Sequence, residues 1–322
     1  MKNFGHVNAA TLEEAVSALR RYGNRAAVIA GGTDLLGKMK DEVLPAYPEA
    51  LINIKTIPGL DFIRYEGGTL SIGALTRLED IATNDAVRNG HAALAEAAHR
   101  TASTHLREMG TIGGNICQDI RCWYYRNPQN RFPCLRKGGG RCYAIDGDNR
   151  YHSIFGGSVE KGCYAVHPSD TAPALVALDA TITTTRRAIR AEDFFQVSAA
   201  KTTVLEDDEI VSRIDLPPLV GKSAFVKFAL RKAIDFPIVN CAAAIGLSRG
   251  KVRSARICLN AVHVKPYRAV KAEEAIIGKA IDEAGVESSA AAAVAGAKPM
   301  SHNAYMVPIA KAMVKRALLG CK

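Results

Sequence analysis

The 322-residue sequence has no apolar stretch that approaches the roughly 18 residues of a membrane-spanning helix. Its first residues carry no apolar segment of the kind found in secretory signals, and no run of five basic residues suggests a nucleic-acid-binding tail. Internal repeats and low-complexity tails are absent too. With 48% hydrophobic and 23% charged residues, the composition excludes a disordered, collagen-like or coiled-coil chain. We therefore expect a soluble cytoplasmic protein with no membrane span and no nucleic acid partner.

The order of the predicted elements indicates an α+β fold with two domains. Residues 1–218 are expected to form the first domain, in which a small α/β unit covers about residues 1–57 and a larger unit covers about residues 58–218. The Pro217-Pro218 pair marks the boundary, and residues 222–322, with strands followed by helices, form a C-terminal α+β domain. The expected helices are 12–22, 91–99, 267–277, 281–296 and 307–319, and the expected strands are 26–30, 51–55, 69–73, 181–185, 223–230, 238–247 and 252–262.

The eight cysteines are unevenly distributed, because five of them fall within residues 117–163. That segment is rich in Arg, Gly and aromatic residues and shows no periodicity, and a loop of this length is usually functional. Clustered cysteines in a reducing compartment more often bind metal or carry out redox chemistry than form disulfides. Their spacing, C-x4-C-x11-C-x7-C-x20-C, lacks the paired knuckles of zinc sites and suits four thiolates around a cubane iron–sulfur cluster.

A cubane cluster has four ligand positions, so one of these five cysteines is not expected to be a ligand. Cys117 lies two residues past Asn115 and is expected to be buried with the glycine loop at that point. The metal ligands in the iron–sulfur loop, residues 117–163, are therefore predicted to be Cys122, Cys134, Cys142 and Cys163. A zinc-stapled loop and free thiols are the two alternatives that the cysteine pattern leaves open.

Positive charge accompanies this segment, in a chain whose formal net charge is +10. Between Cys122 and Cys142 there are five basic residues and no acidic one. We expect these cations and the amides of glycines 138–140 to stabilise an anionic cluster and raise its potential, and the loop to dock an acidic electron carrier. A solvated surface loop is the alternative. The basic residues are Arg126, Arg131, Arg136, Lys137 and Arg141, and the aromatic residues expected to shield the cluster are Trp123, Tyr124, Tyr125 and Phe132.

Two glycine pairs lie about 80 residues apart. The first is in Ala30-Gly31-Gly32-Thr33-Asp34-Leu35 and the second is in Thr111-Ile112-Gly113-Gly114-Asn115. The first lacks the G-x-G-x-x-G spacing of a dinucleotide fingerprint and is not a Walker loop. Each alone fits a tight turn, with Thr33 and Asp34 capping the next helix. Because glycine also lets backbone N–H groups approach a phosphate, the two loops together are suited to clamping the two phosphates of one dinucleotide.

A further polar motif, His167-Pro168-Ser169-Asp170, precedes the apolar segment 171–180. Asp170 is expected to cap the helix that follows, with a contact to a ligand hydroxyl as the alternative. No Ser/His/Asp arrangement and no glycosidase-like pair of carboxylates can be argued from the scattered histidines and acids. No catalytic residue is therefore predicted.

The two glycine motifs and residues 167–170 together resemble the FAD-binding medium subunit of the molybdenum hydroxylases, the xanthine dehydrogenase and carbon monoxide dehydrogenase family. Asp208-Glu209-Ile210-Val211 and Lys227 with Asp235-Phe236-Pro237 are similar to that family as well, so the resemblance spans nearly the whole chain. The cysteine segment resembles the β subunit of 4-hydroxybenzoyl-CoA reductase, in which an insertion carries a [4Fe-4S] cluster.

This resemblance implies the vanillyl-alcohol-oxidase-type (PCMH-like) FAD-binding fold, followed by a C-terminal domain of the CO dehydrogenase flavoprotein type. It implies that Asp170 contacts the ribityl chain or the isoalloxazine ring, that Lys227 lies near the ring edge, and that Trp123 lies between cluster and flavin. The full set of residues expected to bind FAD is Ile29, Ala30, Gly31, Gly32, Thr33, Asp34, Leu35, Thr101, Thr111, Gly113, Gly114, Asn115, Trp123, Asp170 and Lys227.

The same resemblance implies an oxidoreductase subunit that passes electrons within a molybdenum-containing complex. A large subunit would bind molybdopterin, a small subunit would hold a [2Fe-2S] cluster, and ferredoxin or NAD would be the external carrier. Within the family, a xanthine or aldehyde dehydrogenase-type hydroxylase with another substrate is the alternative to a 4-hydroxybenzoyl-CoA reductase. Outside the family, the alternatives are a self-sufficient flavin oxidase and a zinc-stapled binding module.

Overall fold

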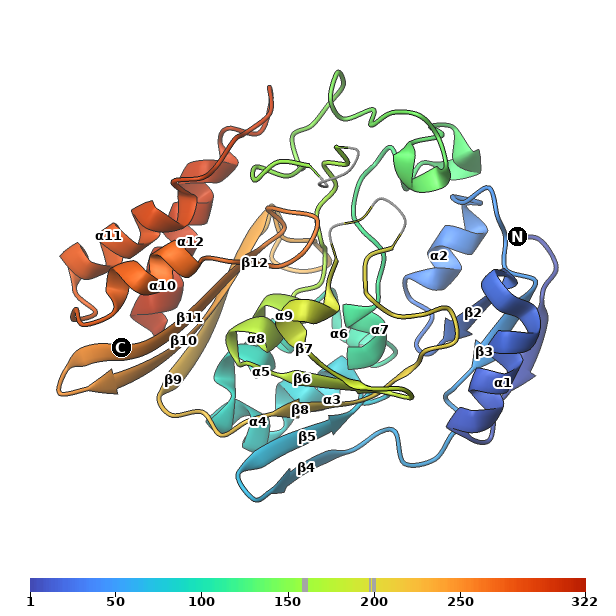
Figure 1. Cartoon of the computed structure of the whole chain (residues 1–322), viewed down its shortest axis with the longest axis horizontal. Coiled ribbons are helices and arrows are strands. Elements are labelled where there is room, and N and C mark those ends of the chain that lie inside the picture. The colour runs from blue at the N-terminus through green and yellow to red at the C-terminus, as the bar shows by residue number, and fades with distance from the viewer. Residues whose placement is uncertain (158–161, 197, 199–200) are drawn as a thin grey trace.

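Three β-sheets organise the chain, and the computed structural model describes residues 1–157, 162–196, 198 and 201–322 (Figure 1). The first sheet is parallel, has the strand order β1-β3-β2 and forms the N-terminal unit. Its elements are β1 (Gly5–Asn8), α1 (Leu12–Tyr22), β2 (Ala26–Ile29), α2 (Leu35–Lys40) and β3 (Ala50–Asn53). At the start of α1, Thr11 Oγ1 accepts from the Glu14 backbone N–H at 3.2 Å, and the Glu14 carboxylate accepts from the Ala10 N–H at 2.8 Å. These two contacts fix the first turn of α1, with Glu14 reaching back to the N–H of the residue before the cap.

The second sheet is antiparallel, has the strand order β4-β5-β8-β6-β7 and packs against short helices. Its core includes Leu70 and Ile72 of β5, Ile182 of β6, and Leu94 and Leu175 of the helices, all fully buried. Each such side chain contributes about 1.5–3 kcal/mol relative to an exposed position. The strands are β4 (Ile63–Glu66), β5 (Thr69–Gly73), β6 (Thr181–Thr184), β7 (Ala188–Arg190) and β8 (Val211–Leu216), and the helices are α3 (Leu78–Thr83), α4 (Asp85–Gly90), α5 (Ala92–His99), α6 (Thr104–Arg107), α7 (Ile112–Ile116), α8 (Thr171–Ala177) and α9 (Ala191–Phe194).

The third sheet, with the antiparallel order β12-β11-β10-β9, separates two hydrophobic cores. Helices α10, α11 and α12 cover one face of this sheet (Figure 1). Cys241, Ala243 and Ile245 of β10 pack into the C-terminal core on that face, whereas Ala242 and Ala244 pack into the core of the larger unit. Because both faces of β10 are buried, its sequence is a continuous apolar run instead of an alternating one. The elements are β9 (Lys222–Phe228), β10 (Val239–Ser248), β11 (Lys251–Asn260), β12 (Tyr267–Arg268), α10 (Val270–Ile276), α11 (Glu283–Val294) and α12 (Met306–Gly320).

Most of the predicted elements lie close to their expected bounds, including the helix over residues 12–22 and the strands over 238–247 and 252–262, which pair as the β10–β11 hairpin. Arg249 and Gly250 form the hairpin turn with φ values of 49° and 76°, as a type I′ turn requires. The helix expected from residue 267 instead begins at Val270, because Tyr267 and Arg268 first pair with β11 as a short strand. In the part of the chain that the structure describes, no helix is long and apolar enough to cross a membrane.

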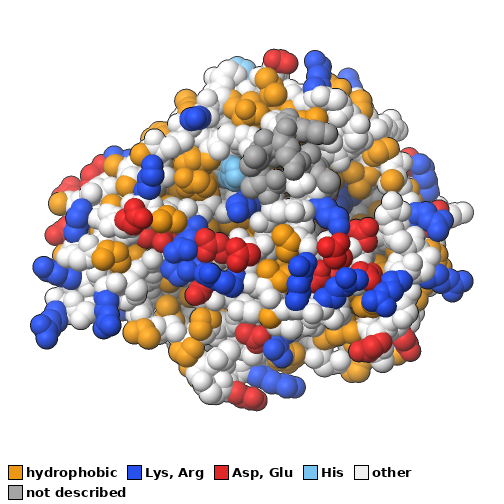
Figure 2. All heavy atoms as spheres, viewed as in Figure 1, with side chains coloured by type: hydrophobic (Ala, Val, Ile, Leu, Met, Phe, Trp, Pro, Cys, Tyr) orange, Lys and Arg blue, Asp and Glu red, His pale blue; other side chains and the backbone are white. Residues whose placement is uncertain are grey.

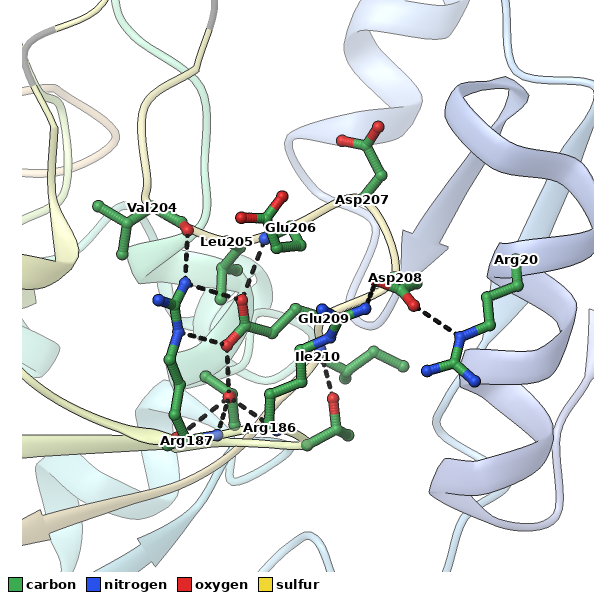
Figure 3. Close-up of polar contacts among 12 residues, drawn as sticks. Arg20, Arg186, Arg187, Val204, Leu205, Glu206, Asp207, Asp208, Glu209 and Ile210 are labelled. Carbon is green, nitrogen blue, oxygen red and sulfur yellow. Dashed lines mark hydrogen bonds and ion pairs between the residues drawn. The ribbon is translucent and has the colours of Figure 1, made fainter.

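Ion pairs fasten residues 204–210 to both N-terminal units (Figure 3). Asp208 accepts from Arg20 of α1 at 2.7 Å, and the buried carboxylate of Glu209 accepts from Arg187, in the turn between β6 and β7, at 3.0 Å. The small unit is therefore held against the second sheet. Figure 2 shows Lys and Arg side chains mixed with Asp and Glu on the visible face, so the positive net charge is not gathered there in one patch.

Candidate functional site

A cleft of about 690 Å³ opens where the small unit, the larger unit and the C-terminal domain meet. Both glycine loops line it. Of the residues predicted to bind a cofactor, all of which the structure describes, Gly113, Trp123 and Lys227 lie outside the lining. The residues of that set that line the cleft are Ile29, Ala30, Gly31, Gly32, Thr33, Asp34, Leu35, Thr101, Thr111, Gly114, Asn115 and Asp170.

The first glycine loop joins β2 to α2 and packs tightly against the residues that precede the second loop. A Cβ on Gly31 would lie 2.0 Å from the carbonyl oxygen of Met109, so a larger residue would have to displace backbone. Gly32 has a φ of +71°, which an L side chain rarely adopts. Glycine is thus required at both positions. Because these residues have no side chain, the backbone N–H groups of the loop are accessible from the cleft, where a phosphate could bind them.

The second glycine loop forms the first turn of α7. Thr111 Oγ1 accepts from the Gly114 N–H at 3.1 Å and so begins the helix. Gly113 is buried, and a Cβ at this position would lie 2.9 Å from a carbonyl oxygen of the loop after β5. Glycine is therefore needed here for close backbone packing, and the residue does not line the cleft. The Asn115 side-chain oxygen accepts from the Ser169 hydroxyl at 2.5 Å, which fixes its orientation at the edge of the cleft.

Asp170 is not the helix cap that its position suggests. Its carboxylate accepts from Asn240 Nδ2 and from Lys227 Nζ, each at 2.7 Å, while the Ser169 hydroxyl accepts from the first turn of α8. Burial raises the pKa of Asp170, although Lys227 and Asn240 stabilise its ionised form. Lys227 is 4% exposed and lies behind Asp170, where its ammonium also donates to two backbone carbonyls. The pair therefore holds one carboxylate in a fixed position at the cleft.

The four cysteines predicted as metal ligands line one small cavity, although they are spread over residues 122–163. Cys134, Cys142 and Cys163 are 7–8% exposed, and no acidic side chain of the described residues lines the cavity. Burial raises the pKa of the Cys122 thiol to about 12, so without a metal it stays protonated at neutral pH. Cys117 lies elsewhere: it is exposed at the end of α7 and lines the cleft. The expectation that Cys117 is buried is wrong, because the short helix ends where the cleft opens.

Two charged side chains of the cysteine segment have buried donors without acceptors in the described structure. Lys137 is 7% exposed and its Nζ has no hydrogen-bond partner, and Arg136, which lines the cavity, has none at Nε. His152 Nε2 lies 3.2 Å from Cys122 Sγ, and burial lowers the pKa of this histidine to about 4, which keeps the ring neutral. Burying a charged donor without an acceptor lowers the stability of the fold. The arrangement therefore fits an anionic group held by the thiols.

A second cavity, of about 380 Å³, adjoins both sites and contains Trp123. Cys122 lines this cavity and the cysteine cavity, whereas Arg121 and Phe236 line it and the cleft. The Arg121 guanidinium carbon lies 3.5 Å from the centroid of the Phe236 ring. Trp123 thus lies beside Cys122 and not in the cleft, with Nε1 donating to the Asp148 carbonyl at 2.9 Å. No sequence motif assigns Arg121 to a site, and its only signal is its place directly before Cys122.

Two ion pairs tie the first glycine loop to the cysteine segment. Asp34, expected to cap α2, instead accepts from Arg126 at 2.7 Å and from the Asp119 N–H at 3.0 Å. Lys38 of α2 pairs with the Asp119 carboxylate at 3.1 Å. Burial alone would raise the pKa of Asp119, but Lys38 and Arg126 hold it well below its usual value. The glycine loop and the cysteine segment are therefore fixed relative to each other.

Comparisons with known proteins match the chain over nearly its full length. The family described as the FAD binding domain in molybdopterin dehydrogenase matches residues 2–219, and the CO dehydrogenase flavoprotein C-terminal domain matches residues 224–321. The aldehyde oxidoreductase FAD-binding subunit PaoB of Escherichia coli (strain K12) is 34% identical, over 97% of this chain and 96% of that protein. The carbon monoxide dehydrogenase medium chain of Hydrogenophaga pseudoflava is 30% identical, over 95% and 92%.

Solved structures have the same fold. The carbon monoxide dehydrogenase of Hydrogenophaga pseudoflava that lacks the Mo-pyranopterin moiety aligns with a TM-score of 0.78 and 29% identity, covering 99% of this chain and 97% of that chain. Quinoline 2-oxidoreductase from Pseudomonas putida 86 aligns with a TM-score of 0.77 over 100% and 98%, and at 24% identity it shows likeness of fold alone. The expected FAD-binding domain followed by a CO dehydrogenase-type C-terminal domain is confirmed. The chain belongs to the FAD-binding medium subunits of the molybdenum hydroxylase family, which are oxidoreductase flavoproteins.

Proposed function

We propose that this subunit carries a [4Fe-4S] cluster in addition to FAD and passes electrons between an external carrier and the molybdenum-containing part of its complex. One observation carries the proposal: four cysteines that are separated in the sequence by 11, 7 and 20 intervening residues line one cavity beside the cleft. The domain organisation expected from the sequence, 1–218 and 222–322, is part of this proposal. When bound, the flavin and the cluster supply the redox chemistry, and the chain supplies position and electrostatics.

The cleft suits FAD because its two glycine loops present backbone N–H groups from separate units. Residues of the Gly31–Asp34 loop and of the Thr111–Asn115 loop would hold the pyrophosphate, as helix starts and bare backbone favour anions. Asp170 would hydrogen-bond the ribityl or isoalloxazine part, and Lys227 would act by holding Asp170 in place. The volume of about 690 Å³ falls in the range of cofactor pockets.

The cysteine cavity suits a cubane better than a zinc ion. Zinc binds thiolates at about 2.3 Å, so the four ligands of one ion crowd together. Among the described residues, no group of three or more His, Cys, Asp or Glu side chains is arranged to hold one metal ion. A cubane offers each of Cys122, Cys134, Cys142 and Cys163 its own iron at a corner, so the four thiols need not converge on one atom. The space between them is about 10 Å³ in the structure, so the cysteine segment would have to open around the cluster when it binds. The unmatched donors of Arg136 and Lys137 supply the positive surroundings that such an anionic group needs.

The second cavity shares lining residues with both the cysteine cavity and the cleft, so it would lie next to both cofactors. Cys122 and Arg121 are neighbours in sequence, and between them they reach the cysteine cavity and the cleft. Trp123 lines the same wall, so we place it between cluster and flavin, as an aromatic contact and not as a residue that touches the pyrophosphate. Tyr124 lines the cysteine cavity, and the centroid of its ring lies 5.2 Å from that of Phe132, so this aromatic pair would limit access of water.

The partners that this function requires are a molybdopterin-binding large subunit and a [2Fe-2S] small subunit, with ferredoxin or NAD as the external carrier. A 4-hydroxybenzoyl-CoA reductase-like complex fits the cysteine segment. An aldehyde-oxidising complex is the second candidate, because the chain is 34% identical to the FAD-binding subunit of an aldehyde oxidoreductase. Steady-state assays of the assembled complex with an aldehyde and with an aromatic acyl-CoA distinguish the two.

Substitution of one predicted ligand tests the cluster directly. Cys134→Ser is expected to remove iron and acid-labile sulfide while FAD is retained, because Cys134 lines the cysteine cavity and not the cleft. Cys117→Ser is the matched control: it changes a cysteine of the same segment that lies outside the cavity, and iron is expected to stay. Retained iron in Cys134→Ser, or lost flavin with iron intact, would contradict the separation of the two sites.

A further inference from the structure

The five basic residues between Cys122 and Cys142 are not equivalent in the structure. Arg126 is already neutralised by Asp34 at 2.7 Å. Arg131 and Arg141 are exposed and lie over aromatic rings, with the Arg141 guanidinium carbon 4.5 Å from the Tyr143 ring centroid. Only the remaining two, Arg136 and Lys137, place charged atoms in the interior of the segment.

Lys137 is the more isolated of these two cations. It ends the single helical turn that begins after Cys134, and its N–H donates to the Cys134 carbonyl at 2.8 Å. Its ammonium is buried without a hydrogen-bond partner in the described structure. Burial lowers the pKa of Lys137, and the sulfurs of Cys134 and Cys122 oppose that shift. Arg136 shares its charge, because one of its Nη atoms donates to the Ser198 carbonyl and the guanidinium also acts on Asp119.

We infer that Lys137, assisted by Arg136, is the built-in counter-charge of the cluster and sets its reduction potential. The inference rests on the proposed function. Reduction by one electron would add one negative charge to a bound cluster while the four thiolates remain, so a buried cation of this chain would stabilise the reduced form more than the oxidised one. No carboxylate among the described residues that line the cavity opposes this effect.

The size of the effect follows from Coulomb's law. At an effective dielectric constant of about 20, a unit charge within roughly 10 Å changes the ratio of reduced to oxidised cluster by roughly tenfold. For a one-electron couple, a tenfold change corresponds to about 59 mV. Removal of the Lys137 charge is thus expected to lower the midpoint potential by about that amount. The effect of Arg136 is expected to be smaller, because its charge is shared with other groups.

The test is a dithionite titration of the assembled complex, followed by the electron paramagnetic resonance signal of the reduced cluster. Lys137→Met keeps the length and burial of the side chain and removes its charge, Lys137→Arg keeps the charge, and Arg131→Gln removes an exposed cation of the same segment. We expect a lowered potential in Lys137→Met only, with iron, sulfide and flavin contents unchanged in all three. A Lys137→Met potential equal to that of the wild type would overturn the inference.

Two other outcomes are also informative. If the wild type contains no iron, the proposed function fails and the inference fails with it. If Lys137→Met does not assemble the cluster, Arg136→Gln takes its place, because Arg136 lines the cavity and its Nε has no hydrogen-bond partner. A lowered potential in Arg136→Gln, with Lys137→Arg unchanged from the wild type, supports a charge effect. An unchanged potential in Arg136→Gln refutes it.

Discussion

The buried pair of Lys227 and Asp170 connects strand β9 of the C-terminal domain to the FAD-binding domain, and we expect its loss to be costly. Both side chains are 4% exposed and their charged atoms are 2.7 Å apart. Lys227→Met leaves the Asp170 carboxylate buried with one hydrogen bond, from Asn240, and such a change typically costs about 3–5 kcal/mol. Asp170→Asn is milder, at about 1–3 kcal/mol, because the Lys227 ammonium keeps two carbonyl acceptors.

The double variant decides whether the two residues act as a unit. With both charges removed, no uncompensated charge stays buried, so the total cost should fall below the sum of the single costs by about 1–3 kcal/mol. Urea denaturation of the purified chain, followed by far-ultraviolet circular dichroism, measures each free energy of unfolding. Lys222→Met, an exposed lysine on the same strand, is the control and should stay within about 0.5 kcal/mol of the wild type. If the losses in free energy of unfolding of the two single variants simply add up in the double variant, the two residues do not act as a unit.

Two further predictions concern the glycine loop and the ion pairs of Figure 3. Gly31→Ala would place a Cβ 2.0 Å from the Met109 carbonyl oxygen, so we expect this variant to lose FAD on gel filtration. The control is Gly37→Ala in α2, where a Cβ would have nothing within 4 Å. It should raise the free energy of unfolding by about 0.5–1 kcal/mol. Burial alone would raise the pKa of Glu209, but hydrogen bonds from Arg187 lower it, so its contribution is present above the unfolded pKa of about 4.3 and is lost as the pH falls. Unfolding free energies measured against pH should therefore decline less steeply below that pH in Glu209→Gln than in the wild type.

Long amphipathic or strongly apolar segments were predictable from sequence periodicity. The helices over 12–22 and 307–319 and the hairpin around Gly250 form because local pattern and tertiary burial agree. The short helices of the larger unit, such as α6 (Thr104–Arg107) and α7 (Ile112–Ile116), span about one turn and carry no periodic signal, so only tertiary packing defines them. The strand at Tyr267 and Arg268 is similar, since pairing with β11 decides it.

The candidate site was predictable where a local motif carries the chemistry, and not where a distant residue decides a side chain's role. Both glycine loops were identified because glycine pairs constrain the backbone locally. Asp170 was expected to cap α8, but Lys227, 57 residues away, and Asn240 bind its carboxylate, and Ser169 provides the cap. Cys117 was expected to be buried, and the cleft that exposes it is formed by three parts of the chain that a sequence pattern does not bring together.

We propose that one chain holds both FAD and a [4Fe-4S] cluster. The most direct measurement is the iron, acid-labile sulfide, zinc and flavin content of the anaerobically purified protein. We expect about four iron and four sulfide atoms and about one FAD per chain. FAD without iron would contradict the assignment of Cys122, Cys134, Cys142 and Cys163 as cluster ligands. Zinc in place of iron would show that these cysteines hold a structural metal and not a redox cluster.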